Sequence, residues 1–75
     1  MSVYRVTELI GTSPTSWEDA ATEAVRRAQQ TIDDVRVAEV LEQDMAMDET
    51  GKITFRTKLR ISFKIRPANT SASGS

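Results

Sequence analysis

The chain contains neither cysteine nor histidine among its 75 residues. These absences exclude disulfide bridges, thiolate or imidazole metal sites and histidine-based catalysis. Any bound metal would have to be a hard cation held by oxygen atoms. So short a chain also buries only a modest core, and such a core supplies about 3–5 kcal/mol. Self-association is therefore the expected supplement to its stability.

The chain also lacks a long apolar run, so we expect no membrane-spanning segment and no membrane partner. The N-terminal stretch MSVYRVTELIG places Arg5 and Glu8 inside its apolar part, which is unlike a signal peptide. A cytoplasmic location is the resulting expectation.

Acidic residues are absent after residue 51, and the charge is therefore unevenly placed. Residues 1–51 carry 4 basic and 11 acidic side chains, whereas residues 52–75 carry 6 basic and no acidic ones. Such a basic segment could bind an anionic ligand, or it could face acidic surfaces of the same chain or of other copies. The net charge of −1 favours the second interpretation, because nucleic-acid-binding proteins usually have a basic excess. We expect no nucleic-acid partner.

Three segments have the pattern of β-strands. Strict alternation in residues 53–65, ITFRTKLRISFKI, predicts a strand with one apolar face and one basic face. Residues 3–10, VYRVTELI, predict a first strand, and residues 36–47, RVAEVLEQDMAM, predict a second strand of mixed polarity. The sequence DETG between the last two strands predicts a hairpin turn, with Gly51 at a positive φ.

Between the first two strands, apolar side chains recur with the helical period in a narrow stripe made mostly of alanine. Ser16 is the expected N-cap, and Asp19 completes an imperfect capping box. The members of the stripe are Trp17, Ala20, Ala21, Ala24, Val25, Ala28, Ile32 and Val35. Because alanine side chains are small, we expect this helix to lie close against one face of a sheet.

The order β-α-β-β predicts an α+β fold. A helical crossover makes the first two strands parallel, and the hairpin makes the third antiparallel to the second. The third strand has the cleanest apolar face, so we place it in the middle of a three-stranded antiparallel sheet of order 1-3-2 packed on one helix. Residues 1–67 then form the domain, and residues 68–75 form a disordered tail of small polar residues. Both sheet edges would be open, which favours association between copies.

The sequence contains no Ser/His/Asp or Cys/His set and no glycine-rich phosphate loop, so we expect no enzymatic activity. The candidate metal ligands are Glu42, Asp44 and Asp48, which share one parity along the second strand and its end. One such set is a poor calcium site, because the ion prefers about 6–8 oxygen atoms, but copies meeting at a symmetry axis would multiply the carboxylates. The alternative is that these acids are solvated strand-end residues or pair with Lys52, Lys58 or Arg60.

Several segments resemble the dodecin family. They are VYRVTELIGTSPTSWEDAATEAVRRA at residues 3–28, the R-x-x-E-V start of the second strand at residues 36–40, and the long alternating last strand. Dodecins are small proteins that assemble as hollow homododecamers, and most of them bind flavins in pairs near two-fold axes. The resemblance implies a homododecamer that holds a ligand where subunits meet.

Two positions depart from the flavin-binding members of that family. Those members have an aromatic residue, usually Trp, after the Arg that opens the second strand, where this chain has Val37. They also have a Gln on the last strand, where this chain has Arg56. Losing the aromatic residue removes a stacking interaction of about 1–3 kcal/mol per ring, judged from base–aromatic pairs. The pattern of GTSPTSW, RVAEVLEQDMAMD and GKITFR is more similar to the branch described as calcium dodecins.

The basic face of the last strand is expected to contact protein. If the register follows the family, Glu39 and Gln43 lie on that side of the sheet. Ion pairs within and between subunits would then neutralise its basic side chains, which are Arg56, Lys58 and Arg60.

These expectations combine into a non-enzymatic homododecameric shell that binds, stores or buffers a small ligand at subunit interfaces, with calcium favoured. A dodecin that binds riboflavin or FMN with a changed stacking residue is the first alternative. A ligand-free structural assembly is the second.

Overall fold

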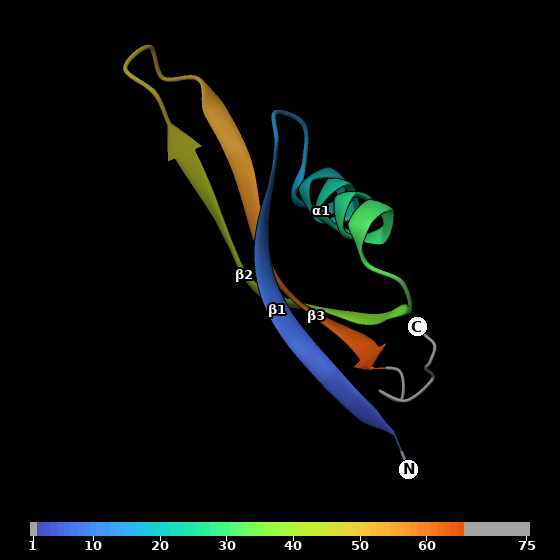
Figure 1. Cartoon of the computed structure of the whole chain (residues 1–75). Helices are drawn as coiled ribbons and strands as arrows, with labels where there is room; N and C mark the ends of the chain where they lie inside the picture. Colours follow the sequence, from blue (N-terminus) through green and yellow to red (C-terminus); the bar gives the residue numbers. More distant parts are fainter. Residues whose placement is uncertain (1, 66–75) are drawn as a thin grey trace.

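The computed structural model describes residues 2–65 and contains one helix and three strands. They follow in the order β1 (Val3–Ser13), α1 (Trp17–Thr31), β2 (Val35–Met47) and β3 (Ile53–Ile65). The sheet has the order β1-β3-β2, with β3 antiparallel to both neighbours, and α1 lies across one face (Figure 1). The predicted fold and strand order are confirmed. The tail predicted at residues 68–75 lies outside the described residues. Within residues 2–65, no helix is long and apolar enough to cross a membrane.

The core lies where the alanine stripe of α1 meets the apolar side of β3. Leu59 and Ile61 are fully buried there, and Thr57 beside them is buried with its hydroxyl donating to the carbonyl oxygen of Trp17 at 2.9 Å. The buried helix residues are Ala20, Ala24 and Ala28. Since these side chains are small, the helix and sheet lie close together and the core is thin.

The start of α1 is fixed by a network of short polar side chains. The hydroxyl oxygen of Ser16 accepts a hydrogen bond from the backbone N–H of Asp19 at 3.0 Å, which confirms the predicted N-cap. The carboxylate of Asp19 accepts from the hydroxyl of buried Ser13 at 2.7 Å, and the Ser13 oxygen accepts from the backbone N–H of Thr15 at 3.0 Å. A serine at the end of β1 therefore takes part in a capping arrangement that the sequence pattern assigned to Ser16 and Asp19 alone.

Two boundaries differ from the predicted ones. β1 continues to Ser13 rather than stopping before Gly11, because Gly11 to Ser13 remain paired with β3. At the other end of the helix, Asp34 has a φ of 60°, and the chain then enters β2 at Val35. The assignment of Val35 to the helical stripe is therefore wrong, although it does pack against the edge of the core.

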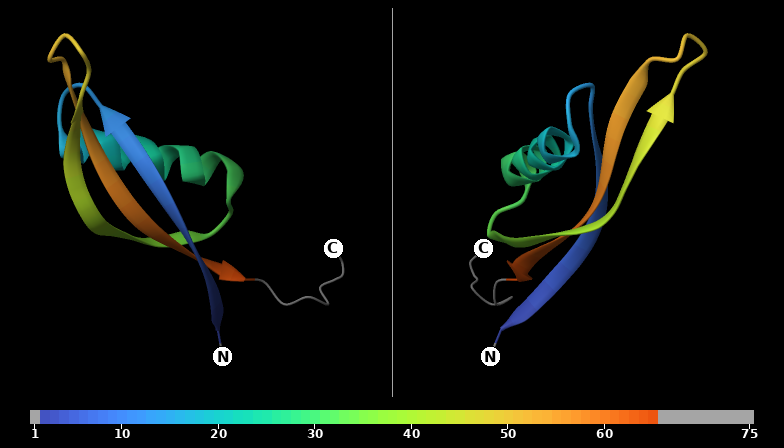
Figure 2. Two further views of the ribbon diagram at one scale, coloured as in Figure 1. Left: turned by 90° about the vertical axis from the view of Figure 1, so that its left-hand side faces the viewer. Right: turned by 180° about the vertical axis from the view of Figure 1, so that it is seen from behind.

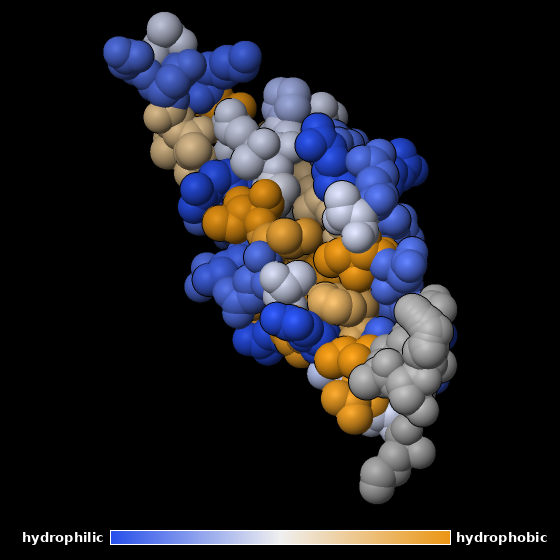
Figure 3. Space-filling model, in the orientation of Figure 1, coloured by the Kyte–Doolittle hydropathy of each residue, from blue (hydrophilic) through white to orange (hydrophobic). Residues whose placement is uncertain are grey.

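Large parts of the sheet are left uncovered by α1. The β2–β3 hairpin extends past the helix in the views of Figures 1 and 2, and its turn contains Gly51 at a φ of 87°, as predicted. Apolar side chains are exposed among charged ones on the surface shown in Figure 3. Those on the sheet and hairpin that are 42–66% exposed are Val3, Tyr4, Val6, Ile10, Val37, Val40, Met45, Met47, Ile53 and Ile65.

Substituting Gly11 tests the close approach of α1 to β1. A β-carbon at this position would overlap the backbone carbonyl oxygen of Ala20. Because a backbone atom cannot rotate away, Gly11→Ala is expected to lower the free energy of unfolding by about 2–3 kcal/mol, near the upper end for overpacking. Chemical denaturation at one fixed protein concentration measures this effect.

Gly51→Ala is the matched control, because a β-carbon there would meet nothing within 4 Å. Its cost is confined to the positive φ and is expected to be about 1 kcal/mol. Equal losses in the two variants would contradict a steric role for Gly11.

Candidate functional site

The face of the sheet turned away from α1, called the outer face below, carries the charged side chains of all three strands. Arg56, Lys58 and Arg60 point to it because they alternate along β3 with residues that face the helix. Their antiparallel neighbours on β2 are acidic: Asp44 lies opposite Arg56, Glu42 opposite Lys58 and Glu39 opposite Arg60. The outer face is therefore an array of opposed charges and not a basic surface.

The shortest contact in this array joins Arg56 to Asp44. The Nε of Arg56 donates to Oδ1 of Asp44 at 2.7 Å, and Nη2 donates to Oδ2 at 3.0 Å. This two-bond geometry uses both carboxylate oxygens and one edge of the planar guanidinium group. The hydrogen bonds lower the pKa of Asp44 and raise the pKa of Arg56.

Arg60 connects the two edge strands across β3. Its Nη2 lies 3.6 Å from Oε2 of Glu8 on β1, and its Nη1 lies 3.5 Å from Oε1 of Glu39 on β2. The Nζ of Lys58 lies 3.6 Å from the other oxygen of Glu8. The residues predicted to form a charged assembly face, Glu39, Lys58 and Arg60, thus all take part in ion pairs within one chain. Their role between subunits stays a prediction.

An irregularity in β2 decides which acids reach the outer face. The register shifts between Val40 and Glu42, which leaves Leu41 without a partner in the ladder. An extra residue of this kind reverses the alternation of the side chains beyond it. It brings three acids onto one face: Glu39, Glu42 and Asp44.

The same shift places Gln43 opposite Thr57, whose side chain is buried on the helix side. The prediction that Gln43 shares a face with Arg56 is therefore wrong. The adjacent apolar residues Val40 and Leu41 interrupt the alternation, and they are the only signal in the sequence that marks the irregularity.

The three predicted metal ligands lie in different surroundings. Both oxygens of Asp44 are bound by Arg56. Asp48 caps the hairpin turn: its Oδ1 accepts from the backbone N–H and the hydroxyl of Thr50 at 2.9 and 2.7 Å and from the N–H of Lys52 at 3.0 Å, and these bonds lower its pKa. The Glu42 side chain is exposed and makes no hydrogen bond or ion pair with the side chains that the structure describes, and its negative charge helps to raise the pKa of Arg56.

A small pocket on the outer face contains two of these carboxylates. It has a volume of about 170 Å³ and is lined by Ile10, Glu42, Asp44, Arg56 and Lys58. Within residues 2–65, no three acidic side chains converge on a point where they could hold a metal ion. The chemistry of the donors fits a hard cation, since they are carboxylates, but their number in one chain does not fill a calcium coordination shell.

Trp17 links the helix to this site. The sequence did not predict this contact. Its indole Nε1 donates to the backbone carbonyl oxygen of Asp44 at 2.9 Å, and its ring meets that of Phe55 edge-on at a centroid distance of 5.2 Å. Trp17 is half-buried rather than a core residue. The backbone of Asp44 is thereby tied to the start of α1.

The two positions that depart from flavin-binding dodecins do not meet within one chain. Val37 lies opposite Ser62 and is largely exposed, and Ser62 lies six residues along β3 from Arg56. At the usual rise per residue this separation is roughly 20 Å. A single ligand could contact Val37 and Arg56 only if a second copy contributed one of them.

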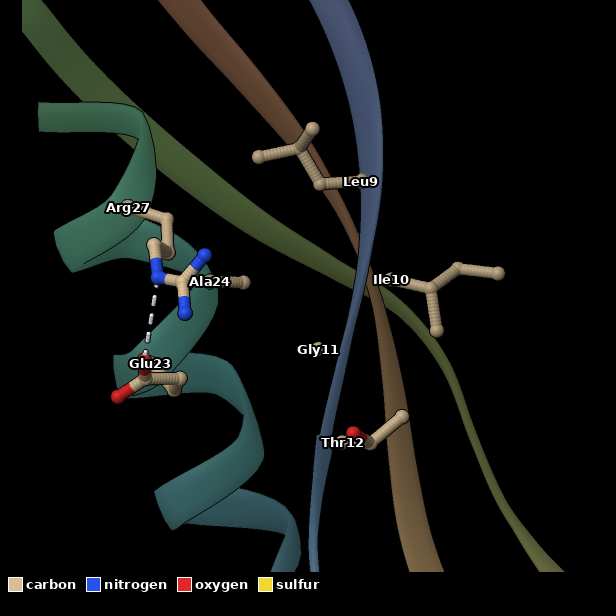
Figure 4. Close-up of a pocket in the computed structure, with 7 residues that line it drawn as sticks. All are labelled: Leu9, Ile10, Gly11, Thr12, Glu23, Ala24 and Arg27. Atoms are coloured by element: carbon tan, nitrogen blue, oxygen red, sulfur yellow. Dashed lines mark ion pairs between the residues drawn. The ribbon is translucent and has the colours of Figure 1, made fainter. Parts of the chain in front are cut away.

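A second cleft lies between α1 and β1, on the other side of the sheet (Figure 4). It has a volume of about 290 Å³, with Leu9 and Ala24 among its apolar lining and the ion pair of Glu23 and Arg27, at 3.5 Å, on the helix. In Figure 4 Ile10 points away from the helix. This cleft exposes the edge of the thin core between α1 and β1 to solvent.

The topology and the charged outer face define a protein of the dodecin type. The model of that family, described as Dodecin, matches residues 3–66, and the chain belongs to the dodecin family. It is 68% identical over 68 residues to the calcium dodecin of Mycobacterium tuberculosis, across 91% of this chain and 96% of that protein. The resemblance seen in the sequence is confirmed.

Solved structures agree with this assignment. A crystal structure of the M. tuberculosis calcium dodecin, described as calcium chelating and as having a novel calcium-binding site, matches with a TM-score of 0.82 at 65% identity over 91% of this chain and 97% of that chain. Dodecin from Streptomyces davaonensis matches with a TM-score of 0.80 at 26% identity over 88% and 97% of the two chains. The fold is thus shared by relatives of quite different sequence.

The lowered pKa values of Asp44 and Asp48 predict how stability depends on pH. A carboxyl group with a lowered pKa binds its proton more weakly in the folded than in the unfolded chain. Its stabilising contribution is complete above the ordinary carboxyl pKa of about 4 and is lost as the pH falls through the lower folded value. Denaturation midpoints should therefore decrease on acidification below about pH 4.

Asp44→Asn removes one of these two titrations, so its midpoint should fall less steeply with acid than that of the parent. Asp48→Asn removes the other and serves as the comparison at a separate site. Identical acid slopes in the parent and both variants would contradict this source of pH dependence.

Proposed function

We propose that the chain forms a homododecameric shell that stores or buffers calcium, bound where subunits meet, without catalysing a reaction. A cytoplasmic location is part of the proposal. The observation that carries it is the composition of the outer face, where carboxylates lie beside exposed apolar side chains. One of these carboxylates, that of Asp44, already binds a cationic group, the Arg56 guanidinium. The relative that is 68% identical is named calcium dodecin, which supports the choice of ion.

Self-association is supported by what the single chain leaves uncovered. Tyr4, Val6, Ile10 and Val37 are each at least half exposed on the outer face. Covering such surface is worth about 25 cal/mol per Å² of apolar area. β1 and β2 are both edge strands of the described sheet, and proteins rarely leave two long edges open. Further copies of the chain would cover both features in a closed symmetric assembly.

Calcium binding is supported by the type of donor atom. Glu42, Asp44 and Asp48 remain the proposed ligands, and they supply the hard oxygen atoms that calcium prefers. Because they do not converge within the described part of one chain, neighbouring copies would have to complete the set. When bound, calcium would neutralise these carboxylates and link the chains that provide them.

Flavin binding is less well supported by the surroundings of the two departing positions. Val37 offers no aromatic surface for stacking. Two donor nitrogens of Arg56, Nε and Nη2, are already hydrogen-bonded to the Asp44 carboxylate, at 2.7 and 3.0 Å. Quenching of riboflavin or FMN fluorescence on addition of the purified protein would contradict the preference for calcium.

The size of the particle in solution tests the assembly. Twelve copies of an 8.3 kDa chain give a mass of about 100 kDa by light scattering, as expected for a closed dodecamer. Val6→Asp replaces an exposed apolar side chain of the outer face with a charged one and is expected to shift the protein to smaller species. Gln30→Asp, on an exposed position of α1, is the control and should keep the parent's mass. A parent protein that scatters as a single chain would contradict the proposal.

Calorimetric titration with Ca²⁺ tests the ligands, with Mg²⁺ as the comparison ion. Asp44→Ala and Asp48→Ala each remove a charged donor and are expected to weaken calcium binding about tenfold or more, since affinity follows the number of charged ligands. Glu49→Ala, an acid in the same hairpin turn that is not a proposed ligand, is the control. Unchanged affinity in both Asp variants would remove these residues from the site, and no heat with the parent would contradict calcium binding itself.

A further inference from the structure

One contact of the outer face places a cation on a proposed calcium ligand. The Arg56 guanidinium donates to each oxygen of Asp44, at 2.7 and 3.0 Å. Lys58 and Arg60, the other two basic residues in the middle of this face, make their ion pairs with Glu8 and Glu39 instead. Of these three side chains, Arg56 is therefore the one that pairs with a proposed ligand.

We propose that Arg56 is an internal counter-cation that competes with calcium for the Asp44 carboxylate and thereby sets the calcium concentration at which the site fills. This inference rests on the proposed function. It concerns the role of Arg56, which that function by itself leaves open.

The competition follows from the geometry of the two cations. A guanidinium that binds both carboxylate oxygens leaves only their remaining lone pairs exposed, and its positive charge repels a divalent ion beside it. Calcium can approach Asp44 closely only if at least one of the two hydrogen bonds opens. The measured calcium affinity is then lower than that of an unpaired Asp44 carboxylate. The reduction grows with the fraction of molecules in which the ion pair is closed.

The backbone around the pair is held in place, so the exchange involves side chains. The carbonyl oxygen of Asp44 accepts from the indole of Trp17 at 2.9 Å, and Arg56 is followed by the fully buried Thr57. Antiparallel pairing keeps Asp44 and Arg56 directly opposite each other. The two side chains therefore pair again whenever calcium leaves. The Asp44 carboxylate then binds calcium when the ion is present and Arg56 when it is absent.

The pocket shows the same balance of charge. Two acids, Glu42 and Asp44, and two bases, Arg56 and Lys58, line its volume of about 170 Å³ together with Ile10. Because the pocket carries equal numbers of opposite charges, it attracts a cation only weakly until one base moves away. A site of this kind responds to calcium at higher concentrations than one made of the same carboxylates alone.

Calcium affinities of the assembled parent and of Arg56→Met test the inference. Methionine keeps an unbranched apolar stem but removes the charge and the donors. We expect calcium to bind Arg56→Met about threefold to tenfold more tightly, from the loss of an exposed ion pair and of a nearby positive charge. Arg56→Lys keeps the charge but cannot form the two-bond fork, so its affinity should lie between those of the parent and Arg56→Met.

Arg27→Met is the matched control, because it also removes an exposed arginine that pairs with a carboxylate, Glu23, at 3.5 Å on the helix. It should bind calcium within about twofold of the parent, since Arg27 lies on α1, does not contact Asp44, and exposed charges are screened by salt. Light scattering on each variant confirms that the assemblies compared have the same size.

The outcomes separate the inference from the proposed function. Calcium binding that is equal in the parent, Arg56→Met and Arg56→Lys overturns the inference and leaves the proposed function intact. Binding by Arg56→Met alone supports the competition but contradicts calcium storage by the parent. Absence of binding in every protein overturns both.

A second measurement covers the case in which Arg56→Met does not assemble. The only tryptophan, Trp17, donates its indole N–H to the backbone of Asp44, so its emission should change when calcium replaces Arg56 on that residue. The change should occur in the parent at the concentrations at which calcium binds, and should be absent in Asp44→Asn. An emission that does not respond while calcium binds would contradict exchange at Asp44.

Discussion

The alternation of side chains along β3 is the constraint on which the rest of the structure depends. On one side, Leu59 and Ile61 meet a stripe of alanines, and on the other, Arg56 and Arg60 face acids of the neighbouring strands. Because the central strand serves both surfaces, the core is a single thin layer and the second surface has no covering within the described chain. The open edges and the exposed apolar side chains support the proposed completion of that surface by further copies.

The charged surface depends on a defect in an otherwise regular sheet. Without the unmatched Leu41 in β2, Glu39 and the pair of Glu42 and Asp44 would lie on opposite faces. The irregularity gathers them opposite the bases of β3. It thus produces both the neutralised ion-pair network and the two-bond contact between Arg56 and Asp44 that the proposed calcium site must open.

Much of the fold could be predicted from the sequence because its signals are local. The alternation of residues 53–65, the N-cap at Ser16 and the turn before Gly51 each depend on neighbouring residues, and each is confirmed. The role of Gly11 and the bond from Trp17 to Asp44 depend on segments far apart in the chain, so no local pattern indicates them. The proposed calcium ligands are harder still to judge from the sequence, since Asp44 lies in an ion pair, Asp48 caps a turn and Glu42 takes part in neither.

The central claim is that the single chain is too thin and too open to remain folded without its copies. The most direct test follows far-UV circular dichroism and sedimentation together while the protein is diluted from micromolar to low nanomolar concentration. The account predicts that loss of secondary structure accompanies dissociation and shifts with protein concentration, as mass action requires for coupled folding and assembly. A dissociated single chain that keeps its full sheet and helix signal at these dilutions would contradict it.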